Sequence, residues 1–160
     1  MRKIAFPPIV DKDSRILLLG TMPGEESLRL QQYYGHKSNQ FWKILFTLFN
    51  KPFFSDYEER KKLVKDNNIA LWDVLSSCEG EGSADSCIKN EAANDFESFF
   101  AAYPQIKVIF FTSAKAAEFY KRYIGFDDSR TYHTLPSPSS AYAKMRLKEK
   151  IEKWKVLLSI

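Results

Sequence analysis

The sequence has little cysteine, no long apolar run and no cluster of charge, and each absence excludes a class of protein. Its two cysteines, Cys78 and Cys87, form no CxxC pair, which excludes a cysteine-built zinc or iron–sulfur site. No stretch reaches the roughly 18 apolar residues of a membrane span. Residues 1–8 are too short and too proline-broken for a signal peptide. We therefore expect no metal or other cofactor, no membrane partner, and reduced thiols in a cytosolic protein, or a nuclear one in a eukaryote.

The composition fits one globular domain over residues 1–160. Hydrophobic residues make up 44% of the chain, which is enough for a core, and no linker or internal repeat divides it. The formal net charge is +4, and the charges are scattered. A mild basic excess is compatible with a nucleic-acid partner, but it does not by itself indicate one. We expect a monomer.

Four short apolar segments predict buried strands, with helical patterns between them. The clearest strand is residues 15–20, a continuous apolar run that ends in glycine. Further strands are expected at residues 69–75, 106–112 and 130–135. Helices are expected at residues 39–49, at 56–65 behind a capping box of Asp56 and Glu59, at 92–101, at 113–123, and from Ser139 or Ser140 to 158.

This alternation predicts an α/β fold: a three-layer α/β/α sandwich with a central, mainly parallel four-stranded sheet. Ligands of such folds bind at the carboxyl ends of the strands. The segments that follow those ends are residues 20–38, 76–87, 112 onward and 136–142. Functional residues are therefore expected in these loops.

Three segments carry residues suited to a nucleic-acid ligand. Residues 20–24 form a glycine–proline loop that could approach a ligand closely, although a plain turn has the same composition. Residues 33–42 place tyrosines, a histidine and Asn39 before a helix, which suits a nucleobase pocket; core packing and a helix cap are the alternative uses. Residues 135–142 form a proline–serine loop suited to a phosphate, or simply a capped turn.

These segments, in this order, resemble the uracil-DNA glycosylase superfamily. Its first motif, Gly-x-x-Pro-Gly, matches residues 20–24, and the mismatch-specific branch follows it with an aromatic residue and a His-Pro-x-Asn-x-Phe-Trp stretch, matched by Tyr34 and residues 36–42. The second motif, a Pro-Ser-Pro-like loop, matches residues 136–140. The Gln-Tyr-Tyr-Gly-His form, the strand through Asp73 and the serine-containing loop after it look most like the hypoxanthine (deoxyinosine) DNA glycosylase branch.

The resemblance implies a metal-free DNA glycosylase of base excision repair. It would hydrolyse the N-glycosidic bond of a deaminated base, hypoxanthine first, flipped out of DNA. The resemblance assigns the catalytic role to Asn39, which would position the water. The residues that it places around the base are Gly20, Thr21, Met22, Pro23, Gly24, Tyr34, His36, Asp73 and Ser76. Those that it places on DNA are Lys37, Pro136, Ser137, Pro138, Ser139, Ser140 and Tyr142.

Three positions depart from the wider family. Met22 stands where other classes carry an acidic or amide residue, Leu135 where they carry a histidine, and Ser139 where many carry a leucine wedge. Asn39 is then the remaining polar candidate, and Tyr142 or a neighbour is expected to act as the wedge. A glycosylase for uracil or mismatched thymine stays open as an alternative, as does a catalytically silent nucleic-acid-binding domain of the same fold.

Overall fold

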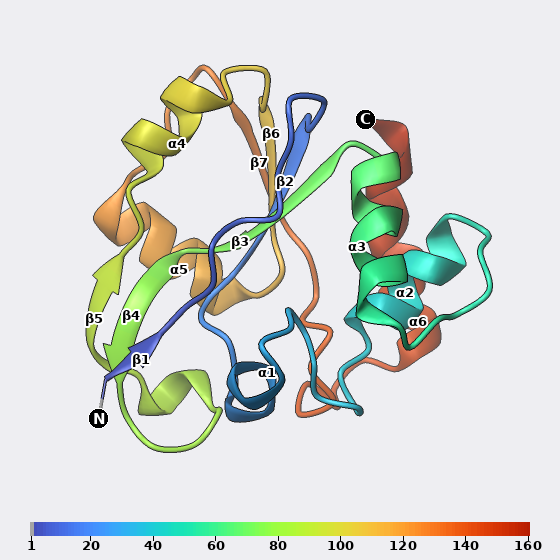
Figure 1. The fold of residues 1–160 in the computed structure, drawn as a ribbon, viewed down its shortest axis with the longest axis horizontal. Helices are drawn as coiled ribbons and strands as arrows, with labels where there is room; N and C mark the ends of the chain where they lie inside the picture. Colours follow the sequence, from blue (N-terminus) through green and yellow to red (C-terminus); the bar gives the residue numbers. More distant parts are fainter. Residues whose placement is uncertain (1) are drawn as a thin grey trace.

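The computed structural model describes residues 2–160 and has a central parallel sheet with helices on both faces (Figure 1). The spatial order of its strands is β3-β2-β6-β7, and each neighbouring pair is parallel. The strands are β2 (Ile16–Gly20), β3 (Ile69–Asp73), β6 (Val108–Phe111) and β7 (Thr131–Thr134). The predicted α/β/α sandwich is confirmed.

β2 lies inside the sheet because it is apolar on both faces. All five of its residues are buried. Leu18 packs into a cluster with Phe41 and Trp42, whereas Leu17 and Leu19 pack into a second cluster on the opposite face. Successive strand residues point to opposite faces, so one continuous apolar run serves both halves of the core.

Each face of the sheet has its own helices (Figure 1). One face is covered by α2 (Phe41–Leu48), α3 (Tyr57–Asp66) and α6 (Leu147–Trp154), the other by α4 (Phe96–Ala102) and α5 (Ala114–Tyr123). A short α1 (Glu25–Leu30) follows β2, and the 3-10 helices are η1 (Asp85–Cys87) and η2 (Lys155–Ser159). Within residues 2–160 no helix is long and apolar enough to cross a membrane.

Two predicted helices begin four or more residues later than expected. Residues 92–93 belong to a strand, and α4 begins only at Phe96, because the Asp95 carboxylate caps it by accepting from the Ser98 N–H at 3.0 Å. The last helix begins at Leu147 rather than at Ser139 or Ser140. The Ser139 hydroxyl accepts instead from the Ala141 N–H at 3.2 Å, in a local turn.

A second, antiparallel sheet was not predicted. Its order is β1-β4-β5, with β1 at Lys3–Ile4, β4 at Leu75–Glu79 and β5 at Lys89–Ala93. The strand expected at residues 69–75 is therefore divided at Val74, whose N–H donates to the Gly20 carbonyl at 2.8 Å. β3 stays in the central sheet, and β4 leaves it.

Candidate active site

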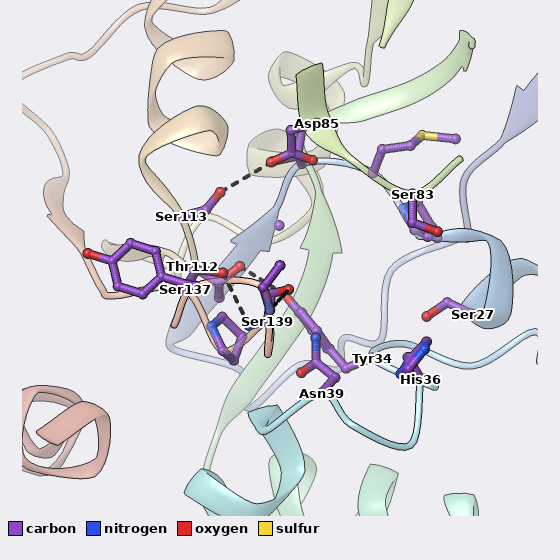
Figure 2. A pocket seen from close by; sticks show the side chains of 18 of the residues that line it. Ser27, Tyr34, His36, Asn39, Ser83, Asp85, Thr112, Ser113, Ser137 and Ser139 are labelled. Carbon is purple, nitrogen blue, oxygen red and sulfur yellow. Dashed lines mark hydrogen bonds between the residues drawn. The ribbon is translucent and has the colours of Figure 1, made fainter. Parts of the chain in front are cut away.

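A cavity of about 940 Å³ opens at the carboxyl ends of the central strands (Figure 2). Its walls come from all four loop regions expected from the sequence: residues 20–39, 73 with 83–85, 112–114, and 134–142. A volume of this order is typical of a small-molecule or nucleobase pocket. The parallel topology thus gathers segments that are far apart in the chain.

Gly20, the last residue of β2, lies where three side chains meet. A Cβ at this position would lie 2.7 Å from Asp73 Oδ1, 2.9 Å from the Tyr34 hydroxyl and 3.6 Å from Thr112 Oγ1. The first two distances are shorter than a Cβ contact allows, so any larger residue at this position would have to displace Asp73 or Tyr34. The Tyr34 hydroxyl lies 3.1 Å from Thr112 Oγ1, whose own hydrogen bond goes to the Leu19 carbonyl at 3.3 Å.

Asp73 is a buried acid in the wall of this cavity. Its residue surface is 4% exposed, and its Oδ2 atom has no hydrogen-bond partner among residues 2–160. Burial, and after it the charge of Asp85, raises the pKa of Asp73 to about 7. Asp73 is therefore poised to change protonation state near neutral pH.

Asp85 is a second acid in the cavity and was not predicted from the sequence. It comes from η1, and its Oδ2 accepts a hydrogen bond from Thr21 at 3.3 Å. The preceding loop docks on the Gly20–Gly24 turn, where Ser83 Oγ accepts from the Glu25 N–H at 2.9 Å. Burial raises the pKa of Asp85, and the Thr21 hydrogen bond and Lys115 oppose that rise. The motif resemblance covered this loop but gave Asp85 no role.

Asn39 lines the cavity and also caps α2 from one residue before its N-cap position, which is Gln40. Its Oδ1 accepts from the Phe41 N–H at 2.9 Å, and its own N–H donates to the His36 carbonyl at 2.9 Å. Figure 2 shows the amide lying beside Tyr34. The two uses considered for Asn39 are therefore compatible, because the cap fixes the orientation of an amide that still lines the cavity.

Tyr34 and His36 line the same wall of the cavity, but Tyr34 is packed against α2 whereas His36 is exposed. The Tyr34 ring stacks on Phe41, with ring centroids 3.8 Å apart and an interplanar angle of 8°. One face of Tyr34 is thus covered, which leaves only its other face for a base. His36 is exposed, and its Nδ1 accepts from the Ser38 N–H at 3.1 Å.

The proline–serine loop is tied to the segment that carries Asn39. The Gln40 N–H donates to the Pro138 carbonyl at 2.8 Å, and the hydroxyls of Ser38 and Ser140 lie 2.9 Å apart. Lys150 of α6 connects the two segments, because its Nζ donates to Gln40 Oε1 at 2.8 Å and to the Ser139 carbonyl at 3.0 Å. The two motifs therefore form one connected unit.

Most of the predicted site residues lie together. Those that line the cavity are Gly20, Thr21, Met22, Pro23, Gly24, Tyr34, His36, Asn39, Asp73, Pro136, Ser137, Pro138, Ser139, Ser140 and Tyr142. Two do not: Lys37 is exposed outside the lining, and the Ser76 hydroxyl donates to the Ala92 carbonyl at 3.2 Å in the small sheet. Thr112, Ser113 and Asp85 line the cavity without having been assigned to the site.

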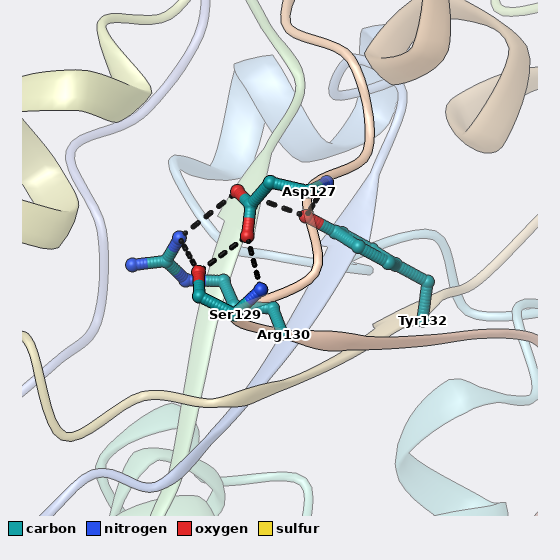
Figure 3. A network of polar contacts seen from close by, with 4 residues as sticks. All are labelled: Asp127, Ser129, Arg130 and Tyr132. Carbon is teal, nitrogen blue, oxygen red and sulfur yellow. Dashed lines mark hydrogen bonds and ion pairs between the residues drawn. The ribbon is translucent and has the colours of Figure 1, made fainter.

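A separate polar network lies at the amino end of β7, away from the cavity (Figure 3). The Asp127 carboxylate accepts from the Ser129 N–H at 2.8 Å and from Arg130 Nη1 at 3.2 Å, and the Asp127 N–H donates to the Tyr132 hydroxyl. The Arg130 guanidinium lies 3.6 Å from the centroid of the Phe100 ring. These contacts fasten the edge strand to α4, which is a structural role.

The described part of the chain has no group of three or more His, Cys, Asp or Glu residues placed to hold a metal.

The fold and the site together match one family of proteins. Residues 7–158 match the family model of the Uracil DNA glycosylase superfamily, and the chain belongs to that superfamily. A hypoxanthine DNA glycosylase of Methanosarcina acetivorans is 36% identical over 159 residues, which cover 98% of each chain. A protein of the same name from Methanosarcina barkeri is 38% identical over 120 residues, 74% of this chain and 76% of that one.

A solved structure shows the same fold. It is a solution NMR structure from Methanosarcina acetivorans, named as a candidate uracil DNA glycosylase. It is similar to this chain with a TM-score of 0.78 and 35% sequence identity, over 99% of both chains. The family predicted from the motifs is thus confirmed.

Proposed function

We propose that this protein is a monofunctional DNA glycosylase that releases hypoxanthine from DNA containing deoxyinosine, acting as a monomer in the cytosol. The observation that carries the proposal is the convergence of both family motifs, with Asn39 and Asp73, on one cavity at the carboxyl ends of the strands. The hypoxanthine DNA glycosylase name of a relative that aligns over 98% of the chain supports the choice of base.

The reaction breaks the bond between the sugar C1′ and the base nitrogen. The electron pair of that bond leaves with the base, and the sugar acquires positive charge before water adds to C1′. An amide is a weak base, so Asn39 would act by orienting the water, which the sugar cation makes reactive. Because its Oδ1 is held by the Phe41 N–H, Asn39 needs no reorganisation before the reaction. Backbone N–H groups of residues 20–24 would stabilise the leaving base.

The flipped base would enter beside Tyr34, whose face opposite Phe41 would offer a stacking surface. The proline–serine loop would grip the DNA backbone through its hydroxyls and N–H groups, aided by the exposed Lys37 next to the cavity wall. The links from this loop to Gln40 and Ser38 would then couple DNA binding to the position of Asn39.

A base-release assay tests the proposal. Duplexes that contain a single hypoxanthine, uracil, xanthine or mismatched thymine are incubated with the protein, and abasic sites are then cleaved with alkali. Strand cleavage at hypoxanthine, absent in Asn39→Ala, is the expected result. Cleavage only at uracil or thymine would show that hypoxanthine is not the substrate. Binding of every duplex without cleavage would show that the protein is a DNA-binding domain and not an enzyme.

A further inference from the structure

The hydroxyl groups around the cavity are oriented differently at two of its acids, Asp85 and Asp73. Thr21 donates to Asp85 Oδ2, and Ser113 Oγ lies 3.3 Å from Thr21 Oγ1. Because the Thr21 hydrogen points to Asp85, the Ser113 hydrogen must point to Thr21. This short chain of hydroxyls directs its hydrogens toward Asp85 and so favours the charged carboxylate there.

At Asp73 the hydroxyls point away. Thr112 donates to the Leu19 carbonyl, which can only accept, so the Tyr34 hydroxyl must donate to Thr112. The Tyr34 hydroxyl, although it lies near Asp73 around Gly20, therefore offers the carboxyl no hydrogen. A buried carboxylate without a donor is unfavourable, whereas a neutral carboxyl needs only an acceptor for its own O–H group. Oδ2 is closed to solvent and has no hydrogen-bond partner within residues 2–160, so an ionised Asp73 would leave a buried charge unpaired.

We infer that Asp73 is the general acid of the reaction and donates its proton to the leaving purine, while Asp85 is a positioning residue that keeps this proton on Asp73. The inference rests on the proposed glycosylase function. The proton passes from the Asp73 carboxyl to an acceptor atom of the purine as the C1′–N9 bond breaks and its electron pair moves to the base. The purine leaves neutral. The oxygen of water bonds to C1′, its excess proton goes to solvent, and solvent reprotonates Asp73.

The charges around Asp73 agree with this assignment. The titratable groups that face it are Asp85 from η1, Tyr33 and Tyr34 from the segment before α2, and Tyr57 from α3, and none of them is a cation. His36 lines the same cavity but is not among the causes of the Asp73 pKa shift. With its pKa raised to about 7, Asp73 holds a proton below neutral pH and loses it above. The ionised form would repel a base that leaves with negative charge.

The test is a pH profile of single-turnover base release from a deoxyinosine duplex, at constant ionic strength from about pH 5 to pH 9. The wild-type rate should fall about tenfold per pH unit above pH 7. Asp73→Asn can donate a hydrogen bond but no proton, so its rate should be about a hundredfold lower in the acid range and should not fall further above pH 7. Asp85→Asn keeps an acceptor for Thr21 but removes the charge, so the midpoint should move to lower pH.

A flat wild-type profile, or an Asp73→Asn profile that keeps the alkaline fall, overturns the role of Asp73. An unchanged midpoint in Asp85→Asn overturns the role of Asp85. Wild-type protein that releases no base at any pH contradicts the proposed function itself, which is a distinct result. If Asp73→Asn does not fold, ¹³C carboxyl NMR of the wild-type protein decides: an aspartate must titrate near pH 7, and its midpoint must fall in Asp85→Asn.

Discussion

Lys150 Nζ lies 2.8 Å from Oε1 of Gln40, the residue that follows Asn39. Lys150 is 1% exposed and makes no ion pair within residues 2–160. Its second hydrogen bond goes to the Ser139 carbonyl at 3.0 Å. Burial lowers the pKa of Lys150, and a buried amine is kept only where its hydrogen bonds compensate for lost hydration. One side chain of α6 therefore binds both motif segments and fixes their relative position.

Replacing Lys150 should loosen this link. In Lys150→Met the Gln40 and Ser139 oxygens lose a buried donor, which should cost about 1–3 kcal/mol of unfolding free energy. Base release should slow further, because the loop and the start of α2 would no longer be held together. Lys148→Met, at an exposed position on the same helix, is the control. Equal urea-unfolding curves for the two variants would show that the buried contacts contribute nothing.

Two substitutions should separate the two functions of Asn39. Asn39→Ala removes the cap, at a cost of about 1 kcal/mol, and removes the amide that lines the cavity. Single-turnover cleavage should then fall about a hundredfold or more. Asn39→Asp keeps the cap, because aspartate caps about as well, so it should retain stability but not the amide chemistry.

Asp56→Ala is the matched control for Asn39→Ala. Asp56 caps α3 by accepting from the Glu58 N–H at 3.0 Å, and it does not line the cavity. This variant should lose a similar amount of stability, measured by thermal unfolding, and retain its cleavage rate. If the cleavage rate falls no more in Asn39→Ala than in Asp56→Ala, Asn39 acts only as a helix cap.

The sequence predicts the central sheet well because its inner strands are continuous apolar runs such as residues 16–20. The small sheet has no such signal. β5 carries the exposed residues Lys89 and Asn90, and its residues 92–93 run into a segment with helical composition, so the sequence favours a helix there. Ser139 likewise has the composition of a helix cap, but its carbonyl binds Lys150 and the helix begins later.

Residues that line the cavity could be predicted where they lie within a contiguous motif, as Asn39 and Tyr34 do. Asp85 was not, because its role depends on Thr21, which is 64 positions away in the chain. Lys150 is 110 positions from Gln40, and a lysine beside an apolar helix stripe would ordinarily be taken as exposed. Pairings of this kind depend on tertiary structure and leave no local pattern.

Asp73 should make stability depend on pH in a defined direction. Its folded pKa, about 7, is raised above the ordinary value of 3.8, so its stabilising contribution is present below about pH 4 and is lost as pH rises toward 7. At about 1.4 kcal/mol per pH unit, this contribution should fall by about 4 kcal/mol by neutral pH, because the carboxyl ionises in the unfolded chain but keeps its proton in the fold. Relative to Asp73→Asn, the wild-type unfolding free energy should therefore fall across this window, as measured by urea unfolding.

Asp95 provides the control of opposite sign. Hydrogen bonds from the side chain and backbone of Ser98 lower the pKa of Asp95, so its contribution is present above its unfolded pKa and is lost as pH falls. Wild-type stability relative to Asp95→Asn should thus rise with pH. If both differences follow the same direction, the buried state of Asp73 is not the cause of its pH dependence.

We expect Tyr142 to fill the gap that a flipped base leaves in DNA. It lines the cavity in the proline–serine loop, where its N–H donates to the Ser139 carbonyl at 3.0 Å and its ring centroid lies 5.5 Å from Lys150 Nζ. Ser139 itself is too small to replace a base. Only duplex DNA leaves a stacked gap, so Tyr142→Ala should slow base release from a duplex about tenfold more than from a single strand, because unstacking a base costs a few kcal/mol. Tyr142→Phe keeps the ring and should behave as wild type on both substrates. Single-turnover rates on matched duplex and single-stranded deoxyinosine substrates measure this, and equal losses on the two substrates would remove Tyr142 from the role of the wedge.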